Sequence, residues 1–385
     1  MVDAVGDTVR EARGLPVGSS LFREIPIVLL AAVAGIAFSA ILMFVQLGFK
    51  DALLLSAGVQ INRMNADLAL ISPQYEYMVA SKVFPQRRLY QTLAVDGVES
   101  VNSVYCALAP WRNPWTRRES MIFMVGFKPH PDVVDLGSAN DLLPQLRVGD
   151  NVLFDSLSRP EFGPVAKELA ANRNVNAEIA GHHVEVVGLF SQGTSFGADG
   201  TVVMSDRNYF RILPYQNPEA VNIGLIILKP GYDPETVRAK IAQLLPNDVL
   251  VLTHSGLVDR EREHWETVTP IGFIINSGVI LGLVVGCIIV YQILYTDVTD
   301  HLGEYATLKA MGYHNRALSS IVIQESAILS LFGFIPGVGL SMLVYSIAGH
   351  ATMLPVKMTF LRFVVVYLLT AAMCMISGSL GVCRA

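Results

Sequence analysis

The chain has 385 residues, of which 52% are hydrophobic and only 16% are charged, whereas about 25% charge is usual in a soluble domain. Its formal net charge of −5 comes without a basic stripe, so the composition argues against nucleic acid as a partner. Because the charged residues concentrate between Lys50 and Glu266, we expect membrane segments at both ends of the chain and a soluble domain between them.

The first long apolar run is uncharged and extends from Ile25 to Val45. As an α-helix it would cover about 30 Å, which is the thickness of the hydrocarbon core of a bilayer. The run is too long for the apolar part of a signal peptide, and no small-residue cleavage site closes it. We therefore expect a retained membrane helix over residues 25–48, preceded by a short segment over residues 1–24.

The polar segment over residues 49–269 contains two predicted strand–helix–strand units. Their elements are a strand at 67–72, a helix at 85–93, a strand at 100–108, a strand at 221–228, a helix at 234–245 and a strand at 249–253. Two such units predict a split βαβ, ferredoxin-like subdomain, and residues 109–219 predict a mostly β subdomain inserted into it. Helical periodicity after Lys50 and again from Asp259 to Val268 predicts stalks. Cys106 is the only cysteine of this segment, so its fold must depend on a hydrophobic core.

Two features of this segment could indicate chemistry. Gly193 to Gly197 match G-x-S-x-G, with Ser195 in the place of a nucleophile. That motif needs a helix after it, and here another strand follows, so we favour a flexible loop, with a membrane-anchored esterase as the alternative. His182 and His183 are neighbours in a predicted hairpin, where adjacent side chains point to opposite faces, so we interpret them as a solvated turn and not as metal ligands.

The sequence contains no G-x-x-x-x-G-K-[ST] motif, which would hold the phosphates of a nucleotide. We therefore expect no catalytic, cofactor-binding or metal-binding residue in this chain. If its function is driven by ATP and Mg²⁺, a separate ATPase subunit must bind them.

Three further apolar runs predict membrane helices over residues 270–296, 320–348 and 360–383. Glycines repeat every four residues in two of them: Gly278, Gly282 and Gly286 in the first, and Gly333 and Gly337 in the second. Such stripes allow two helices to approach closely. The pattern does not decide whether the partner is a helix of the same chain or a sister subunit in a dimer.

The segment from Tyr295 to Ser320 is too long for a simple connection between antiparallel helices, which usually takes about 2–8 residues. Its apolar positions predict a short amphipathic helix along the membrane surface, ended by a glycine. The segment is long enough to bind a partner through which energy enters. The residues that we assign to this contact are Asp300, Leu302, Glu304, Tyr305, Leu308, Lys309, Met311 and Gly312.

Two charges lie inside the last two spans, Glu325 and Arg362. We interpret Glu325 as an acid held by a packing or capping partner near the membrane surface, with ion or proton coupling as the alternative. Arg362 is expected to extend its long side chain to the outer surface of the membrane.

Lysines and arginines near the spans predict their orientation. With four spans, both ends of the chain and residues 297–319 lie on the same side of the membrane. More positive residues lie on this side than on the opposite side: Arg10, Arg13, Arg23, Lys309, Arg316 and Arg384 against Lys357 and Arg362. We therefore expect residues 1–24 and 297–319 in the cytoplasm. Residues 49–269 and the loop over 349–359 are expected outside it.

With these segments placed, the sequence resembles the FtsX and MacB superfamily of ABC permeases, and most closely the DevC-like permeases known from cyanobacteria. The likeness runs over nearly the whole chain. It is carried, in order, by AGIAFSAILMFVQLGFKDAL, NADLALISP, FPQRRLYQ, FDSLSRPEFGP, VVGLFSQGTSFGADG, LPNDVLVLTH and IVYQILYTDVTDHLGEYATLKAMGY.

The resemblance implies an α-helical inner-membrane protein with four transmembrane helices in a 1+3 topology and a large α+β periplasmic domain on helical stalks, as in MacB-like, type VII ABC transporters. It implies a homodimer bound to two copies of an ABC ATPase through a coupling helix at about 297–313. A membrane-fusion adaptor and a TolC-like outer-membrane channel would complete an exporter of a glycolipid or another amphiphile that works by mechanotransmission.

The resemblance also leaves alternatives, because other members of the superfamily extract lipoproteins or regulate an envelope hydrolase. Relatives generally continue past the fourth span with a short tail. The sequence that ends at Ala385 is therefore expected to be trimmed or incomplete there.

Overall fold

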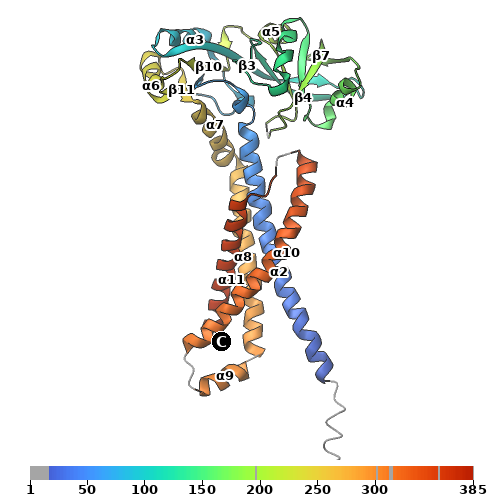
Figure 1. The fold of residues 1–385 in the computed structure, drawn as a ribbon, viewed down its shortest axis with the longest axis vertical. Helices are drawn as coiled ribbons and strands as arrows, with labels where there is room; N and C mark the ends of the chain where they lie inside the picture. The colour runs from blue at the N-terminus through green and yellow to red at the C-terminus, as the bar shows by residue number, and fades with distance from the viewer. Residues whose placement is uncertain (1–16, 196, 301, 312–314, 354–355, 385) are drawn as a thin grey trace, which may run out of the picture. The chain divides into compact units, whose positions relative to one another are not determined.

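The computed structural model describes residues 17–384 except 196, 301, 312–314 and 354–355 (Figure 1). The chain divides into two compact units. The first, called the membrane unit, comprises Met1–Phe49, Ile274–Ile347 and Val356–Ala385, and the second, called the outer domain, comprises Lys50–Phe273 and Ala348–Pro355.

Four helices of the described chain are long and apolar enough to cross a membrane, over Leu30–Gly58, Pro270–Thr296, Ile323–Ala351 and Phe360–Ser379. They belong to α2 (Val17–Gly58), α8 (Pro270–Asp300), α10 (Asn315–Thr352) and α11 (Phe360–Arg384). One such helix precedes the α+β part of the chain and three follow it, which confirms the predicted fold class.

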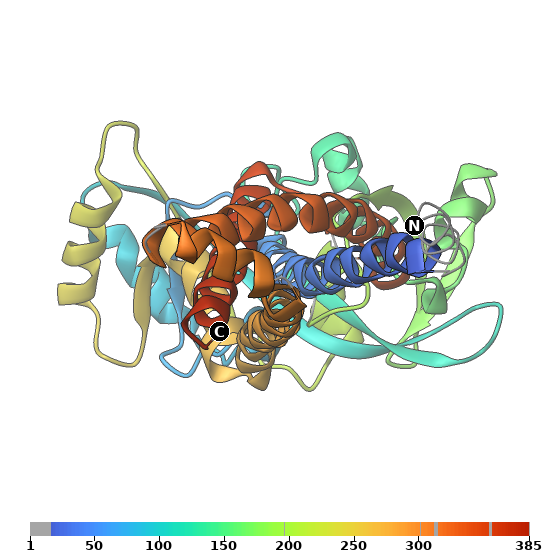
Figure 2. The ribbon, with the colours of Figure 1, turned by 90° about the horizontal axis from the view of Figure 1, so that it is seen from below.

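Inside the membrane unit, α10 crosses α2 near the middle of both helices (Figure 1). A methyl group added at Gly337 would lie 3.0 Å from the Cβ of Ala40 and 3.2 Å from the carbonyl oxygen of Ala37. On the other side of the bundle, α8 and α11 lie beside each other (Figure 2), and the Ser377 hydroxyl donates to the carbonyl of Cys287 at 3.0 Å. Small residues therefore set how closely these helices pack.

One half of the outer domain is a four-stranded antiparallel sheet in the order β11 (Leu250–Thr253), β1 (Leu68–Ile71), β10 (Ile223–Leu228) and β3 (Val98–Arg112). Helix α3 (Gln86–Gln91) connects β1 to β3, and α6 (Pro234–Leu244) connects β10 to β11. This connectivity is that of a split βαβ fold. Leu89 of α3 and Ile241 of α6 pack into one core with Leu70 of β1, so both helices cover the same face of the sheet.

The other half of the outer domain is a small β-barrel. Its further strands are β4 (Glu119–Phe127), β5 (Asn151–Asp155), β6 (Val175–Ile179), β7 (His182–Phe190) and β8 (Thr201–Ser205). The long strand β3 pairs with β4, the ring continues through β8, β5, β7 and β6, and it closes where Trp111 and Arg112 of β3 pair with Ile179 and Glu178 of β6. Closure leaves no free strand edge within the ring. Trp111, Phe154 and Phe162 contribute to the core.

Shorter elements complete the outer domain. The strands β2 (Phe84–Pro85) and β9 (Ala220–Val221) pair with each other, and the helices α4 (Val165–Ala170) and α5 (Asp206–Ile212) lie in the barrel half. Figure 1 shows the barrel half beside the half that carries α3 and α6.

The return stalk is α7 (His254–Glu263), and it continues as a π-helical turn over His264–Val268. The Thr253 hydroxyl accepts from the N–H of Gly256 at 3.1 Å and caps the start of α7. At the far end, Lys50 forms an ion pair with Glu266 in the π-helical turn. Such turns are frequent at functional positions.

One buried carboxylate fixes the loop that follows β7. Asp155, at the end of β5, is fully buried and accepts the N–H groups of Leu157 at 3.1 Å, Gln192 at 2.9 Å and Gly193 at 2.9 Å. Burial raises the pKa of Asp155, and the three N–H donors act in the opposite direction. Asp155 therefore contributes to the attachment of the loop over residues 192–199, together with the ion pair between Asp199 and Arg159.

We expect Gly337→Leu to destabilise the membrane unit by about 1–3 kcal/mol, because the new side chain would be forced against the backbone of α2. The change is measured as the labelling of the buried Cys374 thiol by a fluorescent reagent during heating, in a background with Cys106→Ser, Cys287→Ser and Cys383→Ser. Gly339→Leu is the matched control, since a methyl added there would meet nothing within 4 Å. Equal midpoints for the two variants would contradict the close approach of α10 to α2.

We expect Asp155→Ala to lower the free energy of unfolding of the outer domain by about 1–3 kcal/mol, because three buried N–H groups lose their acceptor. Tryptophan fluorescence during urea unfolding measures this domain selectively, since Trp111, Trp115 and Trp265 all belong to it. Asp141→Ala, at an exposed position, should leave the midpoint unchanged. A similar loss of unfolding free energy in both variants would mean that the hydrogen bonds accepted by Asp155 do not stabilise the domain.

Candidate functional site

A short helix occupies the connection between α8 and α10. This helix, α9, extends over Leu302–Ala310, and the Thr307 hydroxyl donates to the carbonyl of Gly303 at 2.9 Å. Leu302 is 46% exposed and Met311, just after the helix, is 63% exposed. Two large apolar side chains are thus presented near the ends of a helix of the connecting segment.

Lys309 is also exposed. The side chains of Asp300, Glu304, Tyr305 and Leu308, and the whole of Gly312, lie outside the described residues. The helix therefore lies where the sequence predicts it, and the assignment of these residues to a partner stays a prediction.

The glycine stripes face α2 of the same chain. An added methyl group at Gly282 would lie 3.3 Å from the Cβ of Leu42, and Gly278 faces Gln46. Gly286 lies next to both Ser39 of α2 and Met373 of α11. On α10, Gly333 faces Ile36 and Gly337 faces Ala40. Of the two alternatives that the pattern leaves open, the structure shows packing within the chain at these positions.

The sequence suggests that Arg362 extends to the surface of the membrane. The structure shows instead that this side chain is buried in the membrane unit, where it is only 5% exposed. Its Nη1 donates to the carbonyl oxygen of Lys357 at 2.8 Å and to the hydroxyl of Tyr345 at 3.2 Å. The guanidinium carbon also lies 5.6 Å from the centroid of the Tyr345 ring. These contacts replace the hydrogen bonds that water or lipid headgroups would supply at the surface. Glu325, the other intramembrane charge, is partly exposed on α10.

The G-x-S-x-G segment is a loop between two strands, β7 and β8. Ser195 is only 7% exposed, and its backbone N–H and carbonyl exchange hydrogen bonds with Ala198 in a turn. The neighbouring hydroxyl of Thr194 donates to the carbonyl of Met353 at 3.4 Å. This geometry lacks the strand–turn–helix context of a nucleophile elbow.

His182 and His183 lie at the start of β7, in register with Ile179 and Glu178 of β6. The turn itself is formed by Ala180 and Gly181, both at positive φ. Ala180 and Gly181 have the backbone conformation that a tight hairpin turn requires. The histidines follow this turn and belong to the strand.

One residue of the stalk that sequence patterns did not single out is Glu261 of α7. Only 3% of it is exposed, and its carboxyl group accepts the Tyr75 hydroxyl at 2.8 Å and the N–H of Met78 at 2.9 Å. Burial raises the pKa of Glu261 to about 7, although these hydrogen bonds lower it. The spacing of Leu257, Glu261 and Trp265 could have revealed it, because positions four apart share a helix face and this one is buried.

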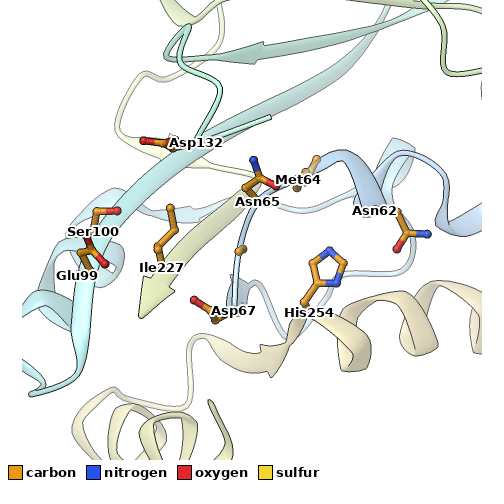
Figure 3. Close-up of a pocket in the computed structure, with 10 residues that line it drawn as sticks. Asn62, Met64, Asn65, Asp67, Glu99, Ser100, Asp132, Ile227 and His254 are labelled. Carbon is orange, nitrogen blue, oxygen red and sulfur yellow. The ribbon is translucent and has the colours of Figure 1, made fainter. Parts of the chain in front are cut away.

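A polar cleft of about 620 Å³ lies where β1 begins and α7 starts (Figure 3). Its lining includes the acids Asp67, Glu99 and Asp132 together with His254. Two of these groups hold the fold, since Asp67 accepts the N–H of Leu228 at 2.8 Å and His254 contacts the carbonyl of Ile61 at 3.2 Å. Asp132 is exposed and lies 3.1 Å from the ring of His130. Figure 3 shows them spread around the cleft and not converging on one point.

Comparison with known proteins gives a match at the C-terminal end. Residues 276–385 match the family model described as FtsX-like permease C-terminal. No curated protein matches the chain.

Among solved structures, the periplasmic region of MacB from Actinobacillus actinomycetemcomitans is 9% identical, with 51% of this chain and 92% of that one covered and a TM-score of 0.35. The extracellular domain of the noncanonic ABC-type transporter YknZ from Gram-positive bacteria is 14% identical, with 48% and 99% covered and a TM-score of 0.34.

The matched residues contain most of α8 together with α9, α10 and α11. With α2, these helices account for all four candidate spans of the described chain. Residues 276–385 are therefore similar to the C-terminal region of FtsX-like permeases, and the described residues include four helices that are long and apolar enough to cross a membrane.

Proposed function

We propose that this chain is the permease subunit of an ATP-driven tripartite exporter that works by mechanotransmission in the inner membrane. It would act as a homodimer with two copies of an ABC ATPase, a membrane-fusion adaptor and a TolC-like outer-membrane channel. Its cargo would be a glycolipid or another amphiphile, as in the DevC-like permeases that the sequence resembles. The observation that carries the proposal is the exposed helix α9 inside the region that matches the FtsX-like model.

Energy has to reach this chain from outside, because its sequence has no phosphate-binding loop of its own. Helix α9 offers the contact for a partner. Leu302 and Met311 are apolar and exposed, and Lys309 adds a charge beside them. An apolar anchor with a polar neighbour is the usual composition of a helix that binds in a groove.

The orientation of the chain supports the same proposal. Lys309 belongs to α9, whereas Lys357 belongs to the connection on the other side of the membrane, and the arginines before the first span add to the side of α9. Positive residues favour the cytoplasmic side, so α9 would face the compartment that contains ATP. The outer domain would then lie in the periplasm, where an adaptor can reach it.

Co-purification of a membrane-fusion adaptor with the permease separates the exporter from the alternatives. Extraction of lipoproteins or control of an envelope hydrolase needs no channel across the outer membrane. Recovery of a hydrolase in place of an adaptor would therefore overturn the tripartite assembly and leave the ATPase-linked permease intact.

The proposed orientation predicts the labelling of two exposed cysteines, introduced one at a time in a Cys383→Ser background. Ser138→Cys, at an exposed position of the outer domain, should react with an impermeant thiol reagent in intact spheroplasts. Ala306→Cys, exposed on α9, should react only after lysis. The reverse pattern would place α9 outside the cytoplasm and remove the proposed ATPase contact.

The proposed coupling predicts that Met311→Asp weakens binding of the ATPase by at least about 30-fold, as loss of an apolar anchor of about 2 kcal/mol would. Because Met311 is mostly exposed, the membrane unit should still fold. The measurement is recovery of the ATPase with the tagged permease in detergent. Leu157→Asp changes another exposed apolar residue, which lies in the outer domain; this variant is the control and should retain the ATPase. Full recovery and full export by Met311→Asp would mean that α9 is only a connector.

A further inference from the structure

The loop over residues 73–80 is attached to the return stalk through a buried carboxyl group and through contacts around it. Glu261 of α7 accepts the Tyr75 hydroxyl and the N–H of Met78, and the Met78 N–H is shared between both carboxyl oxygens at 2.9 and 3.2 Å. Next along the same loop, the Tyr77 ring stacks on His264 at 4.8 Å and meets Trp265 edge-on at 5.2 Å. Side-chain contacts of α7 and the π-helical turn therefore contribute to holding this loop.

The donors that reach Glu261 are all neutral, namely the Tyr75 hydroxyl, the backbone amide of Met78 and the side chain of Trp265. The neighbouring Arg260 donates to the backbone carbonyl of Tyr75, at 3.3 Å from Nη2 and 3.4 Å from Nε. A buried carboxylate held by neutral donors costs more free energy than the same group in its protonated form. Ionisation therefore favours any state in which Glu261 reaches water.

We propose that Glu261 is a proton-sensitive clamp, which fastens the loop over residues 73–80 to the return stalk when protonated and loosens it when ionised. The inference concerns the outer domain alone and does not depend on the exporter function proposed above. It assigns a regulatory role to a group that is neither exposed nor part of the contact on α9.

Among Glu261 and the titratable groups described around it, Glu261 is the group that changes charge near neutral pH. Tyr75 from the loop and Cys106 from β3 both have their pKa raised by burial, so both stay neutral. Arg260 on α7 stays positive. His264 in the π-helical turn faces Glu76, and burial lowers its pKa below its usual 6.5, so it changes charge in more acidic conditions.

The direction of the effect follows from the two states of the carboxyl group. In the closed state burial raises the pKa of Glu261 to about 7, whereas an open, solvated state has the ordinary value of 4.5. The closed state therefore binds the proton more tightly, and its full advantage is present below pH 4.5. This advantage falls as the pH rises and is lost above about 7, which changes the ratio of closed to open by up to about 300-fold.

The clamp acts on more than one loop. A methyl group added at Gly197 would lie 3.1 Å from Cγ2 of Val79, so the loop after β7 rests on the clamped loop. That second loop also reaches Met353 through the hydroxyl of Thr194. Release of residues 73–80 would therefore remove the contact of Val79 with the loop over residues 192–199, while the hydrogen bonds of that loop to Asp155 remain.

Hydrogen exchange of the full-length protein in detergent tests the clamp. Protection of the segment over residues 73–80, corrected for the intrinsic pH dependence of exchange and referred to β8, should fall by up to about 100-fold between pH 5 and pH 8. Glu261→Gln should keep the segment protected to the same extent over this range. Glu263→Gln, which changes an exposed carboxyl group of the same helix, should behave like the wild type.

Tyr75→Phe provides a second test that does not need the Glu261 variant to fold. The Tyr75 hydroxyl stabilises the ionised carboxylate, so its loss should move the midpoint of the wild-type profile to higher pH. A flat wild-type profile, the same profile in Glu261→Gln, or an unmoved midpoint in Tyr75→Phe would each overturn the proposal.

Discussion

Close approach to α2 is the constraint on which the membrane unit depends. Both glycine stripes, on α8 and on α10, face this helix, and at Gly337 the neighbouring atoms include the α2 backbone at Ala37. In a bilayer, apolar side chains gain nothing by leaving lipid for protein, so helices associate through close van der Waals contact and hydrogen bonds. The first span is therefore the common partner of two of the three spans that follow the outer domain, although more than two hundred residues separate it from them in the chain.

The outer domain has a comparable dependence on one strand. β3 forms the edge of the four-stranded sheet with its first part and closes the barrel with its last part, at Trp111 and Arg112. The barrel is formed by a segment inserted after the first part of β3. Because the barrel uses the last part of this strand, the pairing of the first part with β10 is not interrupted. The two halves of the domain are consequently joined through continuous backbone hydrogen bonding, and not by a flexible linker alone.

Much of this fold could be predicted from the sequence, because spans and strands follow from local patterns. Four long apolar runs predict the spans, and the alternation of strands and helices predicts elements close to those found at β1, α3, β10 and α6. Contacts between distant segments could not be predicted in the same way. The partner of the glycine stripes, the burial of Arg362 by Tyr345 and the closure of the barrel at β6 all join residues far apart in the sequence, and no local period encodes them. In the candidate site, the helix α9 was predictable from the spacing of its apolar residues. In the sequence, by contrast, Glu261 is one charged residue among several in a polar stalk.

Two buried carboxyl groups attach the loops that the sequence left without structure. Asp155 holds the loop after β7 through backbone N–H groups, and Glu261 holds the loop over residues 73–80 through a hydroxyl and an amide. The two loops meet at Gly197 and Val79, beside a π-helical turn and away from the sheets. Segments held by few side-chain contacts open at a lower free-energy cost than paired strands. The outer domain can therefore change the conformation of these two loops while the backbone pairing of its sheet and barrel stays intact, and the protonation of one carboxyl group is sufficient to bias that change.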